Sequence, residues 1–146
     1  MILLDTNIFV IDRFFPRDER YGQNRVFLDT LGRLEAAFPL LSLLELCGIA
    51  SYNLSAEELE TWLNDFGSVY RIRVLDPFDL RESKAVEWLG GFISSMAHLI
   101  ARKMRFGDAV ILREAEGYRA EAIVTWNPKD FEDRTKIPVY RPLDMI

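Results

Sequence analysis

Short apolar runs, separated by longer segments of mixed polarity, dominate the hydrophobic pattern of this chain. Residues 1–4 form an uninterrupted apolar run, and residues 122–125 form a second run rich in β-branched side chains. Continuous runs of this length suit strands that are buried on both faces, as in a parallel sheet. Further strands are predicted at residues 39–42, 69–74 and 138–140.

The segments between these runs carry apolar residues at helical spacing. A short helix or turn is predicted at residues 7–11, and longer helices at residues 26–38, 43–52, 55–66, 79–100 and 107–116. Ser55 and Glu58 have the spacing of a capping box, and Gly67 stands where a helix ends. We expect Gly90 and Gly91 to split or kink the run that begins at Asp79, because glycine is costly inside a helix. Helices alternating with short strands predict an α/β fold with a mainly parallel sheet.

Composition bounds the class of protein. The chain has 146 residues without an internal repeat or linker, so a single domain spanning residues 1–146 is expected, and its 49% hydrophobic content favours a folded globular protein. No apolar run is long enough for a membrane span, which predicts a cytoplasmic protein. A lone cysteine, Cys47, and a lone histidine, His98, cannot build a disulfide framework or a usual zinc site. The net charge of −5 does not indicate nucleic-acid binding, although a local basic patch is compatible with it.

Asp5 stands at the end of the first buried run and is followed by Thr6 and Asn7. In open α/β sheets, ligands bind at the carboxyl ends of the strands. Asp5 is therefore a candidate metal ligand, and the alternative is that it only caps the following helix.

Two more carboxylates have both a capping and a ligand interpretation. Glu45 follows Ser42 at capping-box spacing, yet it shares a helical face with Ile49 and Tyr52, where an unpaired carboxylate is costly. Asp108, directly after Gly107, is either a helix cap or an acid on the core side of its helix.

The last candidates follow the strand at residues 122–125. Asn127 and Pro128 form a turn signal, and Asp130 either caps that turn or lies in the same layer as Asp5.

The order and context of these stretches resemble the PIN-domain family, in particular the small VapC-type toxin ribonucleases. The matching stretches are residues 3–7, Glu45, residues 107–109, residues 125–127 and residues 130–131. This resemblance implies a PIN-like three-layer α/β/α sandwich, metal-dependent cleavage of RNA, and catalytic acids at Asp5, Glu45 and Asp108. Many relatives carry a fourth acid where this chain has Asn127, so either Asp130 compensates or Asn127 orients a water molecule.

Carboxylates that cluster without histidine or cysteine favour Mg²⁺ or Mn²⁺ as the cofactor. Asp5 and Asp108 are the expected primary ligands, with Glu45 as a further ligand or a water-orienting base. Thr6, Asn7 and Thr125 would support these carboxylates by hydrogen bonding. A metal-activated water would then hydrolyse the phosphodiester bond.

Basic residues just before Asp108 are candidate RNA contacts: Arg102, Lys103 and Arg105. The alternative is a solvated helix end, where cations suit the helix dipole. Arg13, Arg17, Arg20 and Lys129 are further candidates. The predicted function is a Mg²⁺- or Mn²⁺-dependent endoribonuclease that acts on single-stranded or structured RNA as the toxin of a type II toxin–antitoxin pair. The resemblance also implies a cognate antitoxin partner and a homodimer.

Two other functions compete with this prediction. Asn127 keeps open a degenerate PIN module that binds RNA or a protein partner without cleavage. A strand ending in Asp5 also suits a phosphoaspartyl phosphatase with Asp5 as nucleophile, but those enzymes usually carry a second aspartate where this chain has Asn7.

Overall fold

A five-stranded parallel sheet forms the centre of the computed structural model, which describes residues 1–146. The strands are β1 (Ile2–Leu4), β2 (Ala36–Pro39), β3 (Arg73–Leu75), β4 (Ala122–Val124) and β5 (Val139–Tyr140), in the order β3-β2-β1-β4-β5. Every neighbouring pair is parallel; Ile2 is in register with Ala36 on one side and with Ala122 on the other. The prediction of a mainly parallel sheet is confirmed.

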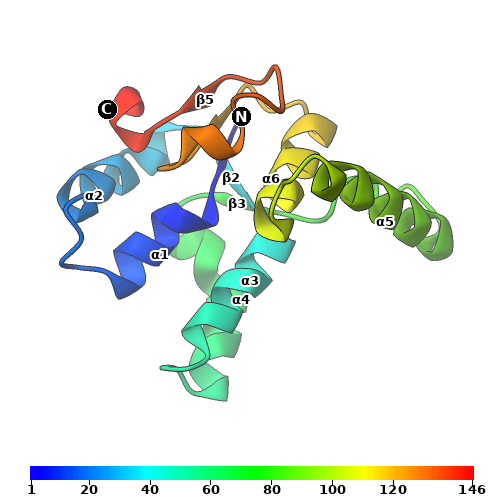
Figure 1. Ribbon diagram of the computed structural model, residues 1–146. Coiled ribbons are helices and arrows are strands. Elements are labelled where there is room, and N and C mark those ends of the chain that lie inside the picture. The colour runs from blue at the N-terminus through cyan, green and yellow to red at the C-terminus, as the bar shows by residue number, and fades with distance from the viewer.

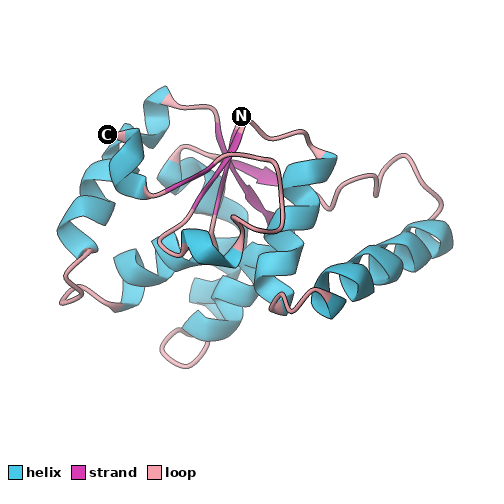
Figure 2. Ribbon diagram, turned by 45° about the horizontal axis from the view of Figure 1, so that its top comes forward, coloured by secondary structure: helices cyan, strands magenta, loops and turns pink.

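The chain has six α-helices, of which α1 to α4 pack on one face of the sheet and α6, with the end of α5, on the other (Figures 1 and 2). They are α1 (Thr6–Phe14), α2 (Tyr21–Thr30), α3 (Leu40–Ala50), α4 (Ala56–Tyr70), α5 (Ala85–Ala101) and α6 (Phe106–Gly117), with short 3-10 helices η1 (Leu31–Arg33), η2 (Pro128–Asp130) and η3 (Pro142–Met145). Because successive strand residues point to opposite faces, Leu4 joins the core formed with α1 to α4, whereas Leu3 joins the core formed with α5 and α6. The predicted three-layer α/β/α sandwich is therefore confirmed.

Aromatic packing fixes α1 against the sheet. Phe9 lies 4.7 Å from Phe38 of β2, 4.9 Å from Phe66 and 4.8 Å from Tyr70, measured between ring centroids. All of these rings are buried, and such pairs contribute beyond the area that they bury. The start of α1, which carries Asp5, is thus held rigidly at the carboxyl end of β1.

Helix α5 differs from the other helices because it projects away from the sheet (Figure 1). Only Met96 and Leu99 of this helix are buried, and they contact the core around α6. None of the helices has the length and apolar character needed to cross a membrane.

Two element boundaries differ from the predictions around the second strand. The strand expected at residues 39–42 lies three residues earlier, and Leu40 already begins α3. The helix expected at residues 26–38 ends at Thr30, because residues 36–39 are needed as the strand beside β1. The prediction was wrong because the apolar residues that lead into this buried strand are spaced as they would be in a helix.

The capping box at Ser55 and Glu58 is confirmed at the start of α4, but Gly67 does not end that helix. The helix continues to Tyr70 and ends with Arg71 in the left-handed conformation, at φ 57°. The amide of Ile72 then donates to the Gly67 carbonyl at 2.9 Å, the long hydrogen bond of a Schellman motif. A Cβ at Gly67 would lie 3.0 Å from the Ile72 carbonyl oxygen, so glycine permits the chain to fold back closely.

Two strand and helix predictions nearby need a related correction. The strand expected at residues 69–74 is restricted to Arg73–Leu75, because the start of that segment completes α4. Helix α5 begins at Ala85 rather than Asp79, and it runs through Gly90 and Gly91 as one helix. A Cβ at either glycine would meet nothing within 4 Å, since both lie on the open side of this projecting helix.

Candidate functional site

The carboxyl ends of β1 and β4 lie side by side at the point where the strand order reverses direction. From β1 the chain moves to β2 and β3 on one side, and then crosses back to β4 and β5 on the other. Ligands of open α/β sheets bind at this kind of switch point. A cavity of about 240 Å³ opens here, lined by Asp5, Thr6, Asn7, Val10, Glu45, Arg105, Gly107, Asp108, Asn127 and Asp130. All five predicted catalytic positions therefore line one cavity.

Asp5 is the most deeply placed of these side chains, with 5% of its surface exposed. One carboxylate oxygen, Oδ2, accepts hydrogen bonds from the Thr125 hydroxyl at 2.6 Å and from the Asn7 side-chain amide at 2.5 Å. The other, Oδ1, accepts from the Asn7 backbone amide at 3.4 Å, so Asp5 also caps α1. The capping and the ligand interpretations are compatible, because a cap occupies only part of a carboxylate.

A short hydrogen-bond network holds Asp5 in place. The Asn7 amide also donates to the Thr125 hydroxyl at 3.0 Å, while its oxygen accepts from the Trp126 backbone amide at 3.2 Å. The Thr125 hydroxyl in turn accepts from the Asn127 backbone amide at 2.9 Å. The two strand ends are thus joined by side chains, which fix the direction of the carboxylate. The supporting contacts predicted for Asn7 and Thr125 are present.

Buried Asn24 extends this network and was not found from the sequence. Its side chain accepts from the Trp126 indole at 2.8 Å and donates to the Ile8 carbonyl at 2.9 Å. A single polar residue within a helical segment gives no signal of such a role, because its partners lie far away along the chain.

The electrostatics of the cavity favour a cation. Burial raises the pKa of Asp5 to about 7, with further contributions from the charges of Asp108 and Glu45, against the lowering effect of the Thr125 hydrogen bond. Burial likewise raises the pKa of Asp108 to about 6, followed by repulsion from Asp130. No lysine or arginine forms an ion pair with Asp5 or Asp108. The buried charge therefore lacks a protein counterion.

Glu45 lies at the mouth of the cavity rather than within an apolar environment. Its side chain is exposed, together with Ile49 and Tyr52 on the same helical face, so the expected burial of this face is wrong. Its Oε2 accepts a hydrogen bond from the Thr6 hydroxyl at 3.2 Å. A Cβ at Gly107 would lie 2.6 Å from Glu45 Oε1, so glycine lets the first turn of α6 approach this carboxylate closely.

The capping alternatives for Glu45 and Asp108 are both wrong. Helix α3 starts two residues before Ser42, whose hydroxyl is buried without a partner, so Ser42 and Glu45 form no capping box. Helix α6 starts at Phe106 with Arg105 as its N-cap, which places Asp108 inside the first turn. Asp108 is half-buried there and faces the cavity lining.

The three candidate RNA contacts before α6 separate in space. Arg105 lines the acidic cavity and its charge lowers the pKa of Asp108. Arg102 instead lines a neighbouring cavity, and Lys103, at φ 67°, lines neither. Arg134 was missed: its guanidinium donates to the carbonyls of Lys129 and Asp130, and its charge acts on Asp108.

The donor set fits a hard divalent cation that keeps much of its hydration. No three acidic or histidine side chains converge as a closed metal-binding cluster. Mg²⁺ does not require one, because it is commonly held by one or two carboxylates, water and substrate phosphate. Asp5 and Asp108 supply such carboxylates, and the lack of any cationic partner for buried Asp5 is the structural reason to expect a cation.

Comparison with known proteins identifies the fold. No protein-family model matches the sequence, and no curated protein matches it significantly. Among solved structures, the chain is similar to FitAcB from Neisseria gonorrhoeae (19% identity, TM-score 0.63, covering 97% of this chain and 98% of that one). It is also similar to VapBC2 from Rickettsia felis bound to a promoter DNA fragment (23%, 0.62, 97% and 98%) and to FitAB bound to the IR36 DNA fragment (18%, 0.59, 98% and 96%).

These neighbours are PIN-domain proteins, and the likeness extends over nearly the whole of both chains. The chain therefore has the PIN fold, with an acidic cavity at the switch point of its sheet. The resemblance to the PIN-domain family that the sequence motifs indicated is therefore confirmed for the fold.

Proposed function

We propose that this protein is an endoribonuclease that depends on Mg²⁺ or Mn²⁺. The observation that carries this proposal is Asp5, a buried carboxylate without a protein counterion, in a cavity shared with three further acids. Removing a charge from water without pairing it is costly, so a fold that retains this arrangement is expected to bind a cation there. The PIN fold supports the choice of a nuclease.

Each side chain of the cavity has a role in this proposal. Asp5 and Asp108 would hold the cation, and Thr125 and Asn7 keep the Asp5 carboxylate in position. A bound divalent cation would neutralise the acids and polarise the scissile phosphate. Glu45, which is exposed at the mouth of the cavity, would orient the attacking water and accept its proton.

The remaining residues would act on the substrate and on the water structure of the cavity. Arg105 is exposed beside Asp108 and would contact a phosphate next to the scissile one. Asn127 is exposed and would orient a water molecule through its amide, while Asp130 would supply the charge that Asn127 lacks.

The test is cleavage of a labelled RNA pool by the purified protein with Mg²⁺ or Mn²⁺. Chelation with EDTA should abolish cleavage, and Asp5→Asn should lower the rate by about 10³-fold, equivalent to roughly 4 kcal/mol of lost transition-state stabilisation. Asp12→Asn, assayed below its melting temperature, is the matched control and should retain the rate. Cleavage that survives both EDTA and Asp5→Asn would rule out this mechanism. RNA binding without cleavage would instead indicate a non-catalytic module.

We also propose that the protein is the toxin of a toxin–antitoxin pair. The structural neighbours are toxin–antitoxin complexes, and α3 exposes Leu44, Ile49 and Tyr52 beside Glu45. An antitoxin segment that covers this apolar surface would also close the mouth of the cavity. Expression of the protein should arrest bacterial growth, and Asp5→Asn should relieve the arrest. Growth arrest of equal strength by both proteins would contradict the proposal.

A homodimer is proposed on the exposed side of α5. Val86, Leu89, Ile93 and Ile100 are between 46% and 85% exposed there, which is unusual for apolar residues on one helix. Sedimentation equilibrium should give twice the mass of 17.0 kDa calculated for one chain. Ile93→Glu should give the monomer mass, and a wild-type protein that sediments as a monomer would exclude the dimer.

A further inference from the structure

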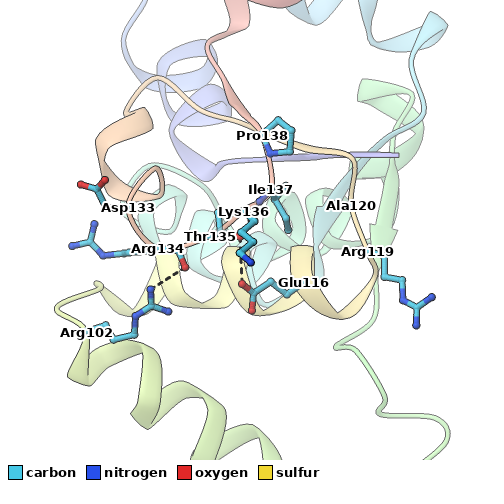
Figure 3. Close-up of a pocket in the computed structure, with 10 residues that line it drawn as sticks. All are labelled: Arg102, Glu116, Arg119, Ala120, Asp133, Arg134, Thr135, Lys136, Ile137 and Pro138. Carbon is cyan, nitrogen blue, oxygen red and sulfur yellow. Dashed lines mark hydrogen bonds between the residues drawn. The ribbon is translucent and has the colours of Figure 1, made fainter.

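A second and larger cavity lies beside the acidic one, between α6 and the segment that leads into β5. Its volume is about 770 Å³, and its lining includes four cationic side chains, Arg102, Arg119, Arg134 and Lys136, with two acidic ones, Glu116 and Asp133 (Figure 3). This local excess of positive charge is opposite in sign to the net charge of −5 of the whole chain. We refer to this cavity as the basic groove.

The cations of the basic groove are not neutralised by the protein. None of the four forms an ion pair with a carboxylate. Arg102 and Arg134 donate only to backbone carbonyls, of Arg134 and of Lys129 and Asp130 respectively. Glu116 accepts a hydrogen bond from the Thr135 hydroxyl at 3.3 Å rather than from a cation.

Another arginine-lined cavity shows the opposite arrangement. It is about 300 Å³ in volume, and its Arg25 pairs with Asp12 at 2.9 Å and with Asp29 at 4.0 Å. Arg13 in the same cavity lies 3.8 Å from Asp12. Two of the three arginines of that cavity, Arg13 and Arg25, are thus paired with carboxylates, whereas none of the four cations of the basic groove is, so these four remain available for an external anion.

Three chain segments contribute residues to both the basic groove and the acidic cavity. Asp130 lines the acidic cavity, and residues 133–138 of the same segment line the groove. In the segment before α6, Arg105 lines the acidic cavity and Arg102 lines the groove. Within α6, Asp108 lines the acidic cavity and Glu116 lines the groove. Asp108 and Glu116 are separated by about 12 Å along the helix axis, at a rise of about 1.5 Å per residue. Arg134 connects the two sites structurally, because it lines the groove and donates to the backbone carbonyl of Asp130, which lines the acidic cavity.

We propose that the basic groove binds the phosphate backbone of the RNA strand a few nucleotides away from the scissile bond. This inference rests on the proposed nuclease function, since it places the substrate on one side of the acidic cavity. Figure 3 shows Arg134 and Arg119 at opposite ends of the groove, with Arg102 beside Arg134 and Lys136 in the middle. Such a spread of cations follows a chain of phosphates better than it fits a single anion. Because no aromatic side chain lines the groove, the contacts are to the backbone and carry no sequence preference.

The test is binding of a fluorescein-labelled, mixed-sequence, single-stranded 20-nucleotide RNA, measured by anisotropy in EDTA so that nothing is cleaved. Lys136→Glu removes an exposed cation that makes no hydrogen bond or ion pair within the protein, so the fold should be retained. We expect its Kd to rise about tenfold at 50 mM salt. The slope of log K against log salt should become shallower by about 0.7 for each phosphate that the variant no longer neutralises. Arg102→Gln should act in the same direction.

Arg33→Glu is the matched control. Arg33 is an exposed, unpaired arginine in η1, next to Leu31 in the core on the opposite face of the sheet. The same charge change there should leave Kd within twofold of the wild type. The groove assignment is overturned if Lys136→Glu and Arg102→Gln weaken binding no more than Arg33→Glu does, or if the wild type does not bind the RNA.

The experiments distinguish a failure of the proposed RNA-binding groove from a failure of the proposed nuclease function. A protein that cleaves RNA with Mg²⁺ but binds it equally well with and without Lys136 would refute only the groove. A protein that cleaves nothing, yet loses RNA binding on Lys136→Glu, would refute the nuclease and retain the groove.

Discussion

Two aspartates with buried side chains, Asp5 at the start of α1 and Asp12 near its end, have contrasting partners. The Asp12 carboxylate contacts Arg25 at 2.9 Å, Arg13 at 3.8 Å and the Tyr70 hydroxyl at 2.6 Å. Asp5 accepts hydrogen bonds only from neutral groups. Asp5 as a whole residue is 5% exposed; Asp12 as a whole residue is partly exposed, but its side chain is only 4% exposed. Both carboxylates are withdrawn from solvent but only Asp12 is neutralised by arginines, so Asp12 serves the fold, and the lack of a partner for Asp5 supports the proposal that it binds a cation.

The largest effect that we expect from the difference between Asp5 and Asp12 is a pH dependence of the unfolding free energy of the metal-free protein. Burial raises the pKa of Asp5 from 3.8 to about 7 in the folded protein. Between pH 4 and pH 7 the Asp5 carboxyl is therefore protonated in the folded state and ionised in the unfolded state. The stability that this proton contributes is fully present below pH 3.8 and is lost as the pH rises to about 7. The loss attributable to Asp5 is at most roughly 4 kcal/mol.

Urea unfolding in EDTA at a series of pH values measures this loss. The difference in unfolding free energy between wild type and Asp5→Asn should change across the interval from pH 4 to pH 7, with the variant gaining relative to the wild type. Adding Mg²⁺ or Mn²⁺ at pH 7 should restore stability to the wild type only. Parallel pH curves for the two proteins would show that Asp5 has its counterion already.

Asp12→Asn tests the other half of the comparison. The substitution leaves one acceptor oxygen for the two donors Arg25 and Tyr70 and removes the negative charge that faces Arg25 and Arg13, which should cost about 2–3 kcal/mol of unfolding free energy. The metal-induced rise in melting temperature should be as large as in the wild type. If Asp12→Asn instead abolished that rise, the division between a structural and a functional aspartate would fail.

The sequence made Asp5 recognisable for a physical reason. Buried parallel strands are short apolar runs, so a carboxylate directly after such a run stands out, whereas Asp130 was found through the turn signal of Asn127 and Pro128 that follows the run of β4. That β1 and β4 are neighbours was not predictable from the runs alone, because strand order depends on how the helices pack. The hydrogen bond from Thr125 to Asp5 spans 120 residues and exists only through that order.

Other features left no trace in the sequence. Asp12 resembles any polar residue of an amphipathic helix, since its partners Arg25 and Tyr70 lie 13 and 58 residues away. The face of α3 that carries Glu45 was expected to be buried because it is apolar, yet apolar residues also form much of a protein surface. The charges of the basic groove come from three separate segments, which meet only in the folded chain.

Thr125→Val separates positioning of Asp5 from its charge. The substitution removes the hydroxyl that donates to Asp5 at 2.6 Å and accepts from the Asn127 amide, while the side-chain volume is nearly kept. Loss of such an outer hydrogen bond should weaken metal binding about 10- to 100-fold. Titration calorimetry with Mn²⁺ measures the change. Thr61→Val, which removes an exposed hydroxyl bonded to its own helix, is the control and should bind Mn²⁺ as the wild type does.

Tyr70→Phe is the corresponding change at Asp12 and should have the smallest effect. The Tyr70 hydroxyl donates to Asp12 and accepts from Arg13 Nε, both at 2.6 Å. Because Arg25 continues to neutralise Asp12, loss of the hydroxyl should cost about 1 kcal/mol of unfolding free energy. Mn²⁺ affinity and RNA cleavage should be unchanged, the reverse of the pattern expected for Thr125→Val. A weaker Mn²⁺ affinity in Tyr70→Phe would mean that the two ends of α1 are coupled, since the hydroxyl lies in the ion-pair cluster and not in the acidic cavity.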